Sequence, residues 1–276
     1  ITGFGGLPKE GLTIIGSLAL IALPSTVAIC LFLVPEKNSY GSSTASLTTN
    51  FKAVWKNGSF KLVWIAFMLK YMGAAWGSAL FMLFAVHVVG EKENVAAILL
   101  GHYFLQLLTL PLWVKLSERI GKKETYIIGG ILFTLVIPLF LLIGNGDTWL
   151  LVFVLACVGA SGSYFTAISM SMKADVIEIA SQRAGENVAG AYIAIWSLGQ
   201  KMIGAVALGI CLPLLQYLGF DPQGGNGPRE LQILSLMYVV PQALMYVGAV
   251  AFVRHYPITA QRLNIMRDRF ERRRAR

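Results

Sequence analysis

A single cation interrupts one of the longest apolar stretches of the sequence. Lys201 lies near the middle of residues 188–218, more than three helical turns from either end. An ammonium group at that depth in hydrocarbon costs on the order of 3 kcal/mol, and neither end is within easy reach of a snorkelling side chain. We therefore expect Lys201 to face the interior of a helix bundle or a water-filled cavity.

Hydrogen-bonding and aromatic side chains in the other apolar stretches could line the same cavity. An alternative role for the aromatic ones is the belt that marks a membrane interface. We predict that the cavity is lined by Lys201 together with Tyr164, Thr166, Gln200, Trp196 and Trp76.

The composition indicates a membrane protein. Of 276 residues, 56% are hydrophobic and 13% are charged, whereas a soluble domain carries about 25% charge. Seven apolar runs are long enough to cross a bilayer as helices, which takes roughly 20 residues each. The predicted spans are 12–34, 62–89, 95–114, 125–143, 149–172, 188–218 and 231–253. The fold class expected is all-α and polytopic.

The distribution of basic residues predicts the orientation. Most of the 23 Lys and Arg residues fall in 35–61, 115–124, 173–187 and the tail from Arg254, which are alternate connections. By the positive-inside rule this side is cytoplasmic, so the N-terminus lies outside and the C-terminus inside. The net charge of +9 then reflects topology and affinity for anionic lipid, and no nucleic-acid partner is expected. The protein is expected in the inner or plasma membrane.

A polar, Ser- and Thr-rich connection divides the chain unevenly. We expect one leading helix in 1–36, a cytoplasmic linker in 37–61, six helices in 62–254 and a basic cytoplasmic tail in 255–276. One helix followed by six is natural for a chain that holds the end of one half of a transporter and the whole of the next.

Several motifs together resemble the glycoside–pentoside–hexuronide:cation symporters of the major facilitator superfamily, typified by the melibiose carrier. They are Ala174-Asp175-Val176-Ile177-Glu178, Gly185-Glu186, Lys201-Met202-Ile203-Gly204 and His255-Tyr256-Pro257-Ile258. The related sodium-dependent lysophospholipid symporters share these elements. The resemblance implies two six-helix halves around a midplane cavity, with this chain holding the last helix of the N-terminal half and all six helices of the C-terminal half.

The same resemblance implies roles for charged residues. It places Lys201 near the cation and substrate site, and it places a charge network that closes the cytoplasmic gate in 115–123 and 173–187. The plainer interpretation of 115–123 is a tight basic turn between two spans. The predicted gate residues are Asp175, Glu178, Arg183, Glu186, Arg119, Lys122 and Lys123.

Three further residues leave two interpretations open. Lys70 lies eight residues into its span and could snorkel to the end, so a structural or gate-lining role competes evenly with a role in the site. His102 and Gln106 are four residues apart on one helix face. They could relay a proton, although a hydrogen-bonded contact between helices is the favoured interpretation.

The function expected is cation-coupled symport of a sugar, glycoside or related amphiphile by alternating access. The expected partners are a small-molecule solute, the lipid bilayer and the missing N-terminal half. No cofactor, metal site or enzyme activity is expected, and the coupling ion is Na⁺ or H⁺. The alternative is a seven-helix receptor or retinal protein with a Schiff-base lysine. Against it, Lys201 is in the sixth span and all 14 carboxylates lie outside the deep membrane.

Overall fold

The computed structural model describes residues 9–33, 54–184 and 188–256, and the chain divides into the units Ile1–Ser42 and Ser43–Arg276. The first unit contains α1 (Lys9–Leu33), an apolar helix with Pro24 inside it. Two of its hydroxyl groups are satisfied within the helix, because Ser25 donates to the carbonyl of Ile21 at 2.7 Å and Thr26 to that of Ala22 at 2.8 Å. These bonds let polar side chains lie in an apolar segment.

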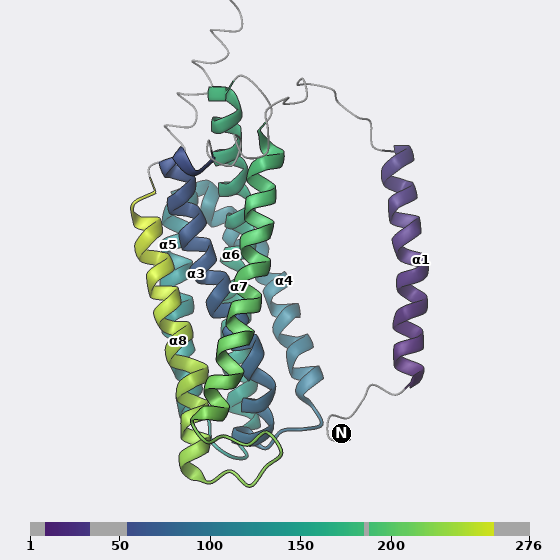
Figure 1. The fold of residues 1–276 in the computed structure, drawn as a ribbon, viewed down its shortest axis with the longest axis vertical. Helices are drawn as coiled ribbons and strands as arrows, with labels where there is room; N and C mark the ends of the chain where they lie inside the picture. Colours follow the sequence, from purple (N-terminus) through teal and green to yellow (C-terminus); the bar gives the residue numbers. More distant parts are fainter. Residues whose placement is uncertain (1–8, 34–53, 185–187, 257–276) are drawn as a thin grey trace, which may run out of the picture. The chain divides into compact units, whose positions relative to one another are not determined.

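In its described residues, the second unit is a bundle of six long helices (Figure 1). Two of the helices change pitch towards one end, where α3 continues as a π-helix, η1, and α5 as a 3₁₀ helix, η2. The elements are α3 (Gly58–Leu83), η1 (Phe84–Val89), α4 (Val95–Ile120), α5 (Lys122–Val136), η2 (Ile137–Leu142), α6 (Thr148–Ala184), α7 (Ala189–Tyr217) and α8 (Pro228–Arg254).

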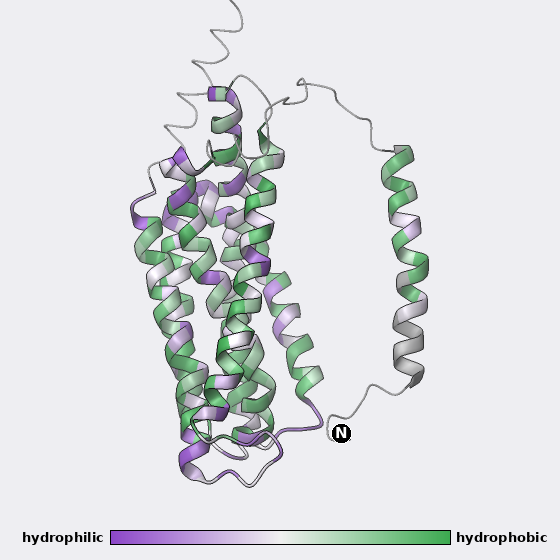
Figure 2. Ribbon diagram, in the orientation of Figure 1, coloured by the Kyte–Doolittle hydropathy of each residue, from purple (hydrophilic) through white to green (hydrophobic). Residues whose placement is uncertain are grey.

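The all-α prediction is confirmed for the described residues, which contain helices and no strands. Six helices are long and apolar enough to cross a membrane, and they coincide with the last six predicted spans. The apolar part of α1, Gly16–Phe32, is shorter, so the predicted number of seven spans is not confirmed. Figure 2 shows hydrophobic residues along the bundle and hydrophilic ones mainly at its two ends.

The predicted domain boundaries stay predictions. Residues 37–53 of the linker and 257–276 of the tail lie outside the described residues. The linker prediction runs to residue 61, but α3 already begins at Gly58, where the Asn57 side chain accepts a hydrogen bond from the backbone N–H of Phe60 at 3.2 Å. This cap satisfies one of the free donors at the start of the helix.

Helix α3 lies at the centre of the packing, against α8 and α7, while α4 packs on α6, and α5 packs on both α6 and α8. Gly73 and Gly77 form the contact with α8. A Cβ atom at Gly73 would lie 2.5 Å from the ring of Tyr246, and one at Gly77 would collide with the Gln242 amide. Between them the indole N–H of Trp76 donates to the carbonyl of Met237 at 2.8 Å. Small residues of this kind let two helix backbones approach where lipid gives no hydrophobic driving force.

The turn predicted over 115–123 is confined to one residue. Helix α4 runs to Ile120 and α5 begins at Lys122, with Gly121 between them at a φ of 96°. Its N–H donates to Ser117 at 3.0 Å and its carbonyl accepts from Thr125 at 3.1 Å. Glycine adopts this left-handed conformation without the steric penalty that a Cβ atom would bring. The two helices are therefore joined almost without a loop.

A carboxylate organises the opposite end of the bundle, where η1 leads into α4. Glu91 accepts hydrogen bonds from the backbone of Asn94 at 3.0 Å and of Glu93 at 3.2 Å, and from the Thr148 hydroxyl at 3.0 Å. These bonds, the one from the Asn94 backbone foremost, lower the pKa of Glu91. The Glu91 side chain thus links this connection to the start of α6.

Substituting Gly73 by alanine tests the contact between α3 and α8. We expect Gly73→Ala to lower the free energy of unfolding by about 1–3 kcal/mol, because the added methyl group overpacks the buried ring of Tyr246. Thermal unfolding in detergent measures the change. Gly101→Ala in α4 is the control, since a Cβ atom there has no neighbour within 4 Å. Equal stability of the two variants would contradict this account of the contact.

Candidate functional site

A cavity of about 440 Å³, which we call the central cavity, is formed between helices of the six-helix unit and is partly open to the surface. It has residues from α3, α4, α5, η2, α6 and α8 in its wall, so most of the bundle contributes to it. The wall is mostly apolar and aromatic. Its hydrogen-bonding or charged members, tyrosines apart, are Lys70, Ser78, His102, Gln106, Thr166 and Gln242.

Lys70 is the charged group of this cavity. Its side chain is 6% exposed, and its ammonium group lies 4.0 Å from the ring centroid of Phe133, 4.3 Å from that of Tyr246 and 5.6 Å from that of Phe165. Aromatic faces attract a cation because their quadrupole is negative there. The snorkelling interpretation of Lys70 is therefore wrong, because the side chain is held inside the bundle.

Two polar side chains of the wall are tied to neighbouring backbone. His102 donates through Nδ1 to the carbonyl of Leu155 at 2.9 Å, and a Cβ atom on Gly159 would lie 2.5 Å from the carbonyl oxygen of His102. The favoured interpretation of His102 as a helix contact is confirmed. On the other side, the Gln242 side-chain N–H donates to the Tyr238 carbonyl, and the Tyr246 hydroxyl donates to Gln242 Oε1 at 3.3 Å.

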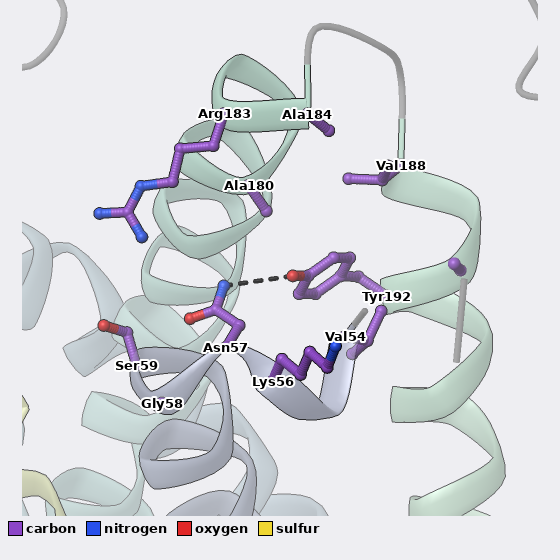
Figure 3. A pocket seen from close by; sticks show the side chains of 11 residues that line it. Val54, Lys56, Asn57, Gly58, Ser59, Ala180, Arg183, Ala184, Val188 and Tyr192 are labelled. Carbon is purple, nitrogen blue, oxygen red and sulfur yellow. Dashed lines mark hydrogen bonds between the residues drawn. The ribbon is translucent and has the colours of Figure 1, made fainter. Parts of the chain in front are cut away.

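A second cavity, of about 480 Å³, opens where α3 and α7 begin and α6 ends (Figure 3). Its polar wall contains Lys56, Ser59 and Arg183. The Asn57 side chain crosses it and donates from Nδ2 to the hydroxyl of Tyr192 at 3.1 Å. This hydrogen bond joins the start of α3 to the first turns of α7.

Most basic residues of the bundle gather at the same end, which we call the basic end. Its members are Lys56, Lys61, Lys115, Arg119, Lys122, Lys123, Lys173, Arg183 and Arg254, whereas Lys92 and Arg229 lie at the other end. Lys122 of α5 forms an ion pair with Asp175 of α6 at 2.5 Å. Asp175 is nearly buried, while Lys122 keeps about a third of its surface exposed.

Two aromatic side chains make further contacts at the basic end. The ammonium group of Lys173 lies 4.4 Å from the ring centroid of Trp196 on α7. Tyr256, which follows α8, is 2% exposed, and burial together with the negative charge of Asp175 raises the pKa of its hydroxyl group. The basic end thus brings α5, α6, α7 and the residues after α8 into contact.

The structure separates the predicted cavity residues. Thr166 lines the central cavity. Tyr164 is buried among Trp113, Tyr126 and Phe133, and Trp76 is held by its bond to Met237. Trp196 lies beneath Lys173. Gln200 and Lys201 lie on α7, the latter exposed, and neither is in the wall of the two cavities. The role of Lys201 stays a prediction.

The predicted gate residues are closer together. Asp175 and Lys122 are paired, and Glu178 accepts a hydrogen bond from Gln182 at 3.3 Å. Arg183 lines the cavity of Figure 3. Arg119 is exposed and Lys123 is half-buried near the turn, whereas Glu186 lies outside the described residues. Their function as a gate stays a prediction.

Lys70 was not among the predicted cavity residues, although its side chain lines the central cavity. The available signal was a lysine inside a span whose neighbours include Tyr71 and the Gly73–Gly77 pair, both typical of a packed helix face. Depth along the helix could not distinguish a side chain that turns inward from one that reaches the end.

Comparison of the sequence with known proteins finds transport proteins among its relatives. The chain is 25% identical over 223 residues to sodium-dependent lysophosphatidylcholine symporter 1 of Gallus gallus, covering 79% of this chain and 42% of that protein. It is 22% identical over 263 residues to the Homo sapiens protein of the same name, covering 92% and 48%. The chain thus spans about half the length of the curated relatives it matches. A family model described as MFS/sugar transport protein matches residues 1–260, and the chain belongs to that family.

Proposed function

We propose that this chain forms part of a secondary transporter that moves an amphiphilic organic solute together with a coupling cation. The central cavity carries the proposal, because five helices and η2 form one space whose wall contains the ammonium group of Lys70, hydrogen-bonding groups and aromatic rings. Its volume falls within the range of small-molecule sites, about 300–1,000 Å³. The family and the names of the relatives support coupled transport over the receptor or retinal alternative.

The solute class follows from the cavity wall. A free sugar presents hydroxyl groups on all sides and requires many hydrogen-bonding partners. Here aliphatic and aromatic side chains make up most of the wall, and His102 and Gln242 already bind backbone. These features favour an amphiphile, such as a glycoside with an apolar aglycone or a lysolipid, over a simple sugar.

We propose that the coupling cation, Na⁺ or H⁺, binds to ligands that this six-helix bundle does not contain. Dehydrating a cation near the membrane midplane calls for an acidic oxygen, and the 14 carboxylates of the chain lie outside the deep membrane. In the described residues no group of three or more His, Cys, Asp or Glu side chains forms a metal site. We therefore propose that a second six-helix half supplies the acid and closes the cavity by alternating access.

The basic end is proposed to be cytoplasmic, in the inner or plasma membrane. It holds most of the Lys and Arg residues of the bundle, in agreement with the positive-inside rule. Helix α6 has 37 residues, which at about 1.5 Å each exceeds the hydrocarbon thickness. Its final turns, with Asp175, therefore extend into the interface, where the pair with Lys122 can form and break as a gate.

The first test is gradient-driven uptake by the intact transporter in proteoliposomes. We expect a fluorescent short-chain lysophosphatidylcholine to accumulate under an inward Na⁺ or H⁺ gradient and methyl galactoside to accumulate far less. Lys201→Ala should reduce coupled uptake at least about tenfold if its charge serves the cation site, whereas Lys92→Ala, at an exposed lysine of the opposite end, should not. Uptake that is insensitive to both gradients would refute the proposed function.

The gate is tested by charge exchange across the ion pair. Asp175→Asn should lower the free energy of unfolding by about 1 kcal/mol, since a pair with one partner partly in water is screened. It should also make the cytoplasmic side more accessible to a thiol reagent at a cysteine introduced for Ser171. The double exchange Lys122→Asp with Asp175→Lys should restore both readouts in part. Lys61→Gln, at an exposed lysine of the basic end outside the predicted gate, is the control. The same accessibility in all variants would exclude a gating role.

A further inference from the structure

The buried ammonium group of Lys70 lacks an anionic partner within the described part of the chain. The ion pair found there joins Lys122 and Asp175, and no described carboxylate oxygen lies within 4 Å of Lys70 Nζ. The contacts of Lys70 are instead with the rings of Phe133, Tyr246 and Phe165. Its positive charge is therefore solvated by aromatic faces on one side and by the cavity on the other.

Magnitudes indicate that the rings alone do not compensate the charge. A cation–π contact contributes about 0.5–2 kcal/mol, whereas the effective penalty for taking an ion out of water is several kcal/mol. An anion that enters the cavity would meet a cation already stripped of water. It would gain a charge-assisted hydrogen bond, which is about twice as strong as a neutral one.

The surroundings of Lys70 define what else such an anion must carry. Phe81, Met82, Ile137 and Phe140 extend the wall as an apolar surface, so the rest of the ligand must be largely apolar. The free ring nitrogen of His102 and the hydroxyl of Thr166 provide a few polar contacts. A neutral sugar would leave the ammonium group unpaired and the apolar wall in contact with hydroxyl groups.

We propose that Lys70 is the anion-recognising residue of the central cavity, and that the ligand it selects carries a carboxylate or phosphate on a mainly apolar body. This rests on the proposed function, because it names the solute class of the same cavity. Lys70 then determines specificity between acidic and neutral amphiphiles. The carboxylate of an aryl glucuronide and the phosphate of a lysolipid offer the same chemistry to it.

Equilibrium binding to the intact transporter in detergent tests the proposal without any ion gradient. The probes form two matched pairs, p-nitrophenyl glucuronide against p-nitrophenyl glucoside, and hexanoyl lysophosphatidate against monohexanoylglycerol. We expect the wild-type protein to bind at least one acidic probe about tenfold or more tightly than its neutral partner. The pair that shows the preference identifies the carboxylate or the phosphate as the recognised group.

Substituting Lys70 assigns that preference to one residue. Lys70→Met removes the charge but keeps the length and an apolar body, so the bundle is expected to fold, and Lys70→Gln provides a second variant. Both should abolish the acidic preference and leave affinity for the neutral probes within about twofold. Lys70→Arg, which keeps the positive charge, should retain most of the preference for the acidic probes. Lys61→Gln, at an exposed lysine of the same helix, is the matched control.

Two outcomes would overturn the proposal. One is a wild-type protein without acidic preference in either pair, and the other is a preference that survives in Lys70→Met and Lys70→Gln. Failure of the proposed function has a separate signature, since gradient-driven uptake would then be absent while the binding preference and its dependence on Lys70 persist.

Discussion

The close approach of α3 to α8 is the constraint on which the central cavity depends. In a bilayer, apolar side chains gain nothing by leaving lipid for another apolar surface, so helix association relies on van der Waals contact and hydrogen bonds. Gly73 provides the contact, and the Tyr246 ring fills the space that a Cβ atom would occupy. The same ring lies 4.3 Å from the ammonium group of Lys70. One side chain thus sets the spacing of two helices and forms part of the cavity wall.

The bundle accommodates its cations in two different ways. At the basic end, Lys122 is partly exposed and meets a carboxylate, so its charge is neutralised where water can still screen it. Inside the bundle, Lys70 meets aromatic faces that attract a cation without cancelling its charge. The first arrangement favours a stable contact between α5 and α6. The second preserves a positive potential inside a water-poor space, where electrostatic interactions are strongest.

Much of the fold was predictable from the sequence, because length and hydropathy alone determine which segments can cross a bilayer. Helix ends were not, since α6 continues beyond the predicted end of its span at Met172 as far as Ala184. Hydropathy detects where apolar residues stop, whereas a helix continues as long as its backbone bonds and packing allow.

The rotation of each helix about its axis also escaped prediction. Helix α3 is apolar on all sides, so its sequence has no periodicity that marks the inner face. Depth along the span separated Lys70 from Lys201 in the sequence, but it could not show which of the two side chains faces the interior of the bundle. The structure buries the first and exposes the second on α7. The aromatic residues around Lys70 come from α5, α6 and α8, and no local pattern could associate them.

The one-residue joint at Gly121 has a mechanical consequence. A connection without slack transmits any tilt of α4 to α5, because the hydrogen bonds to Ser117 and from Thr125 anchor the joint in both helices. Helix α5 carries Lys122 in its first turn and Phe133, which contacts Lys70, three turns further on. A tilt of the α4–α5 pair is therefore expected to displace both the ion pair beside Gly121 and the part of the central cavity wall that Phe133 forms.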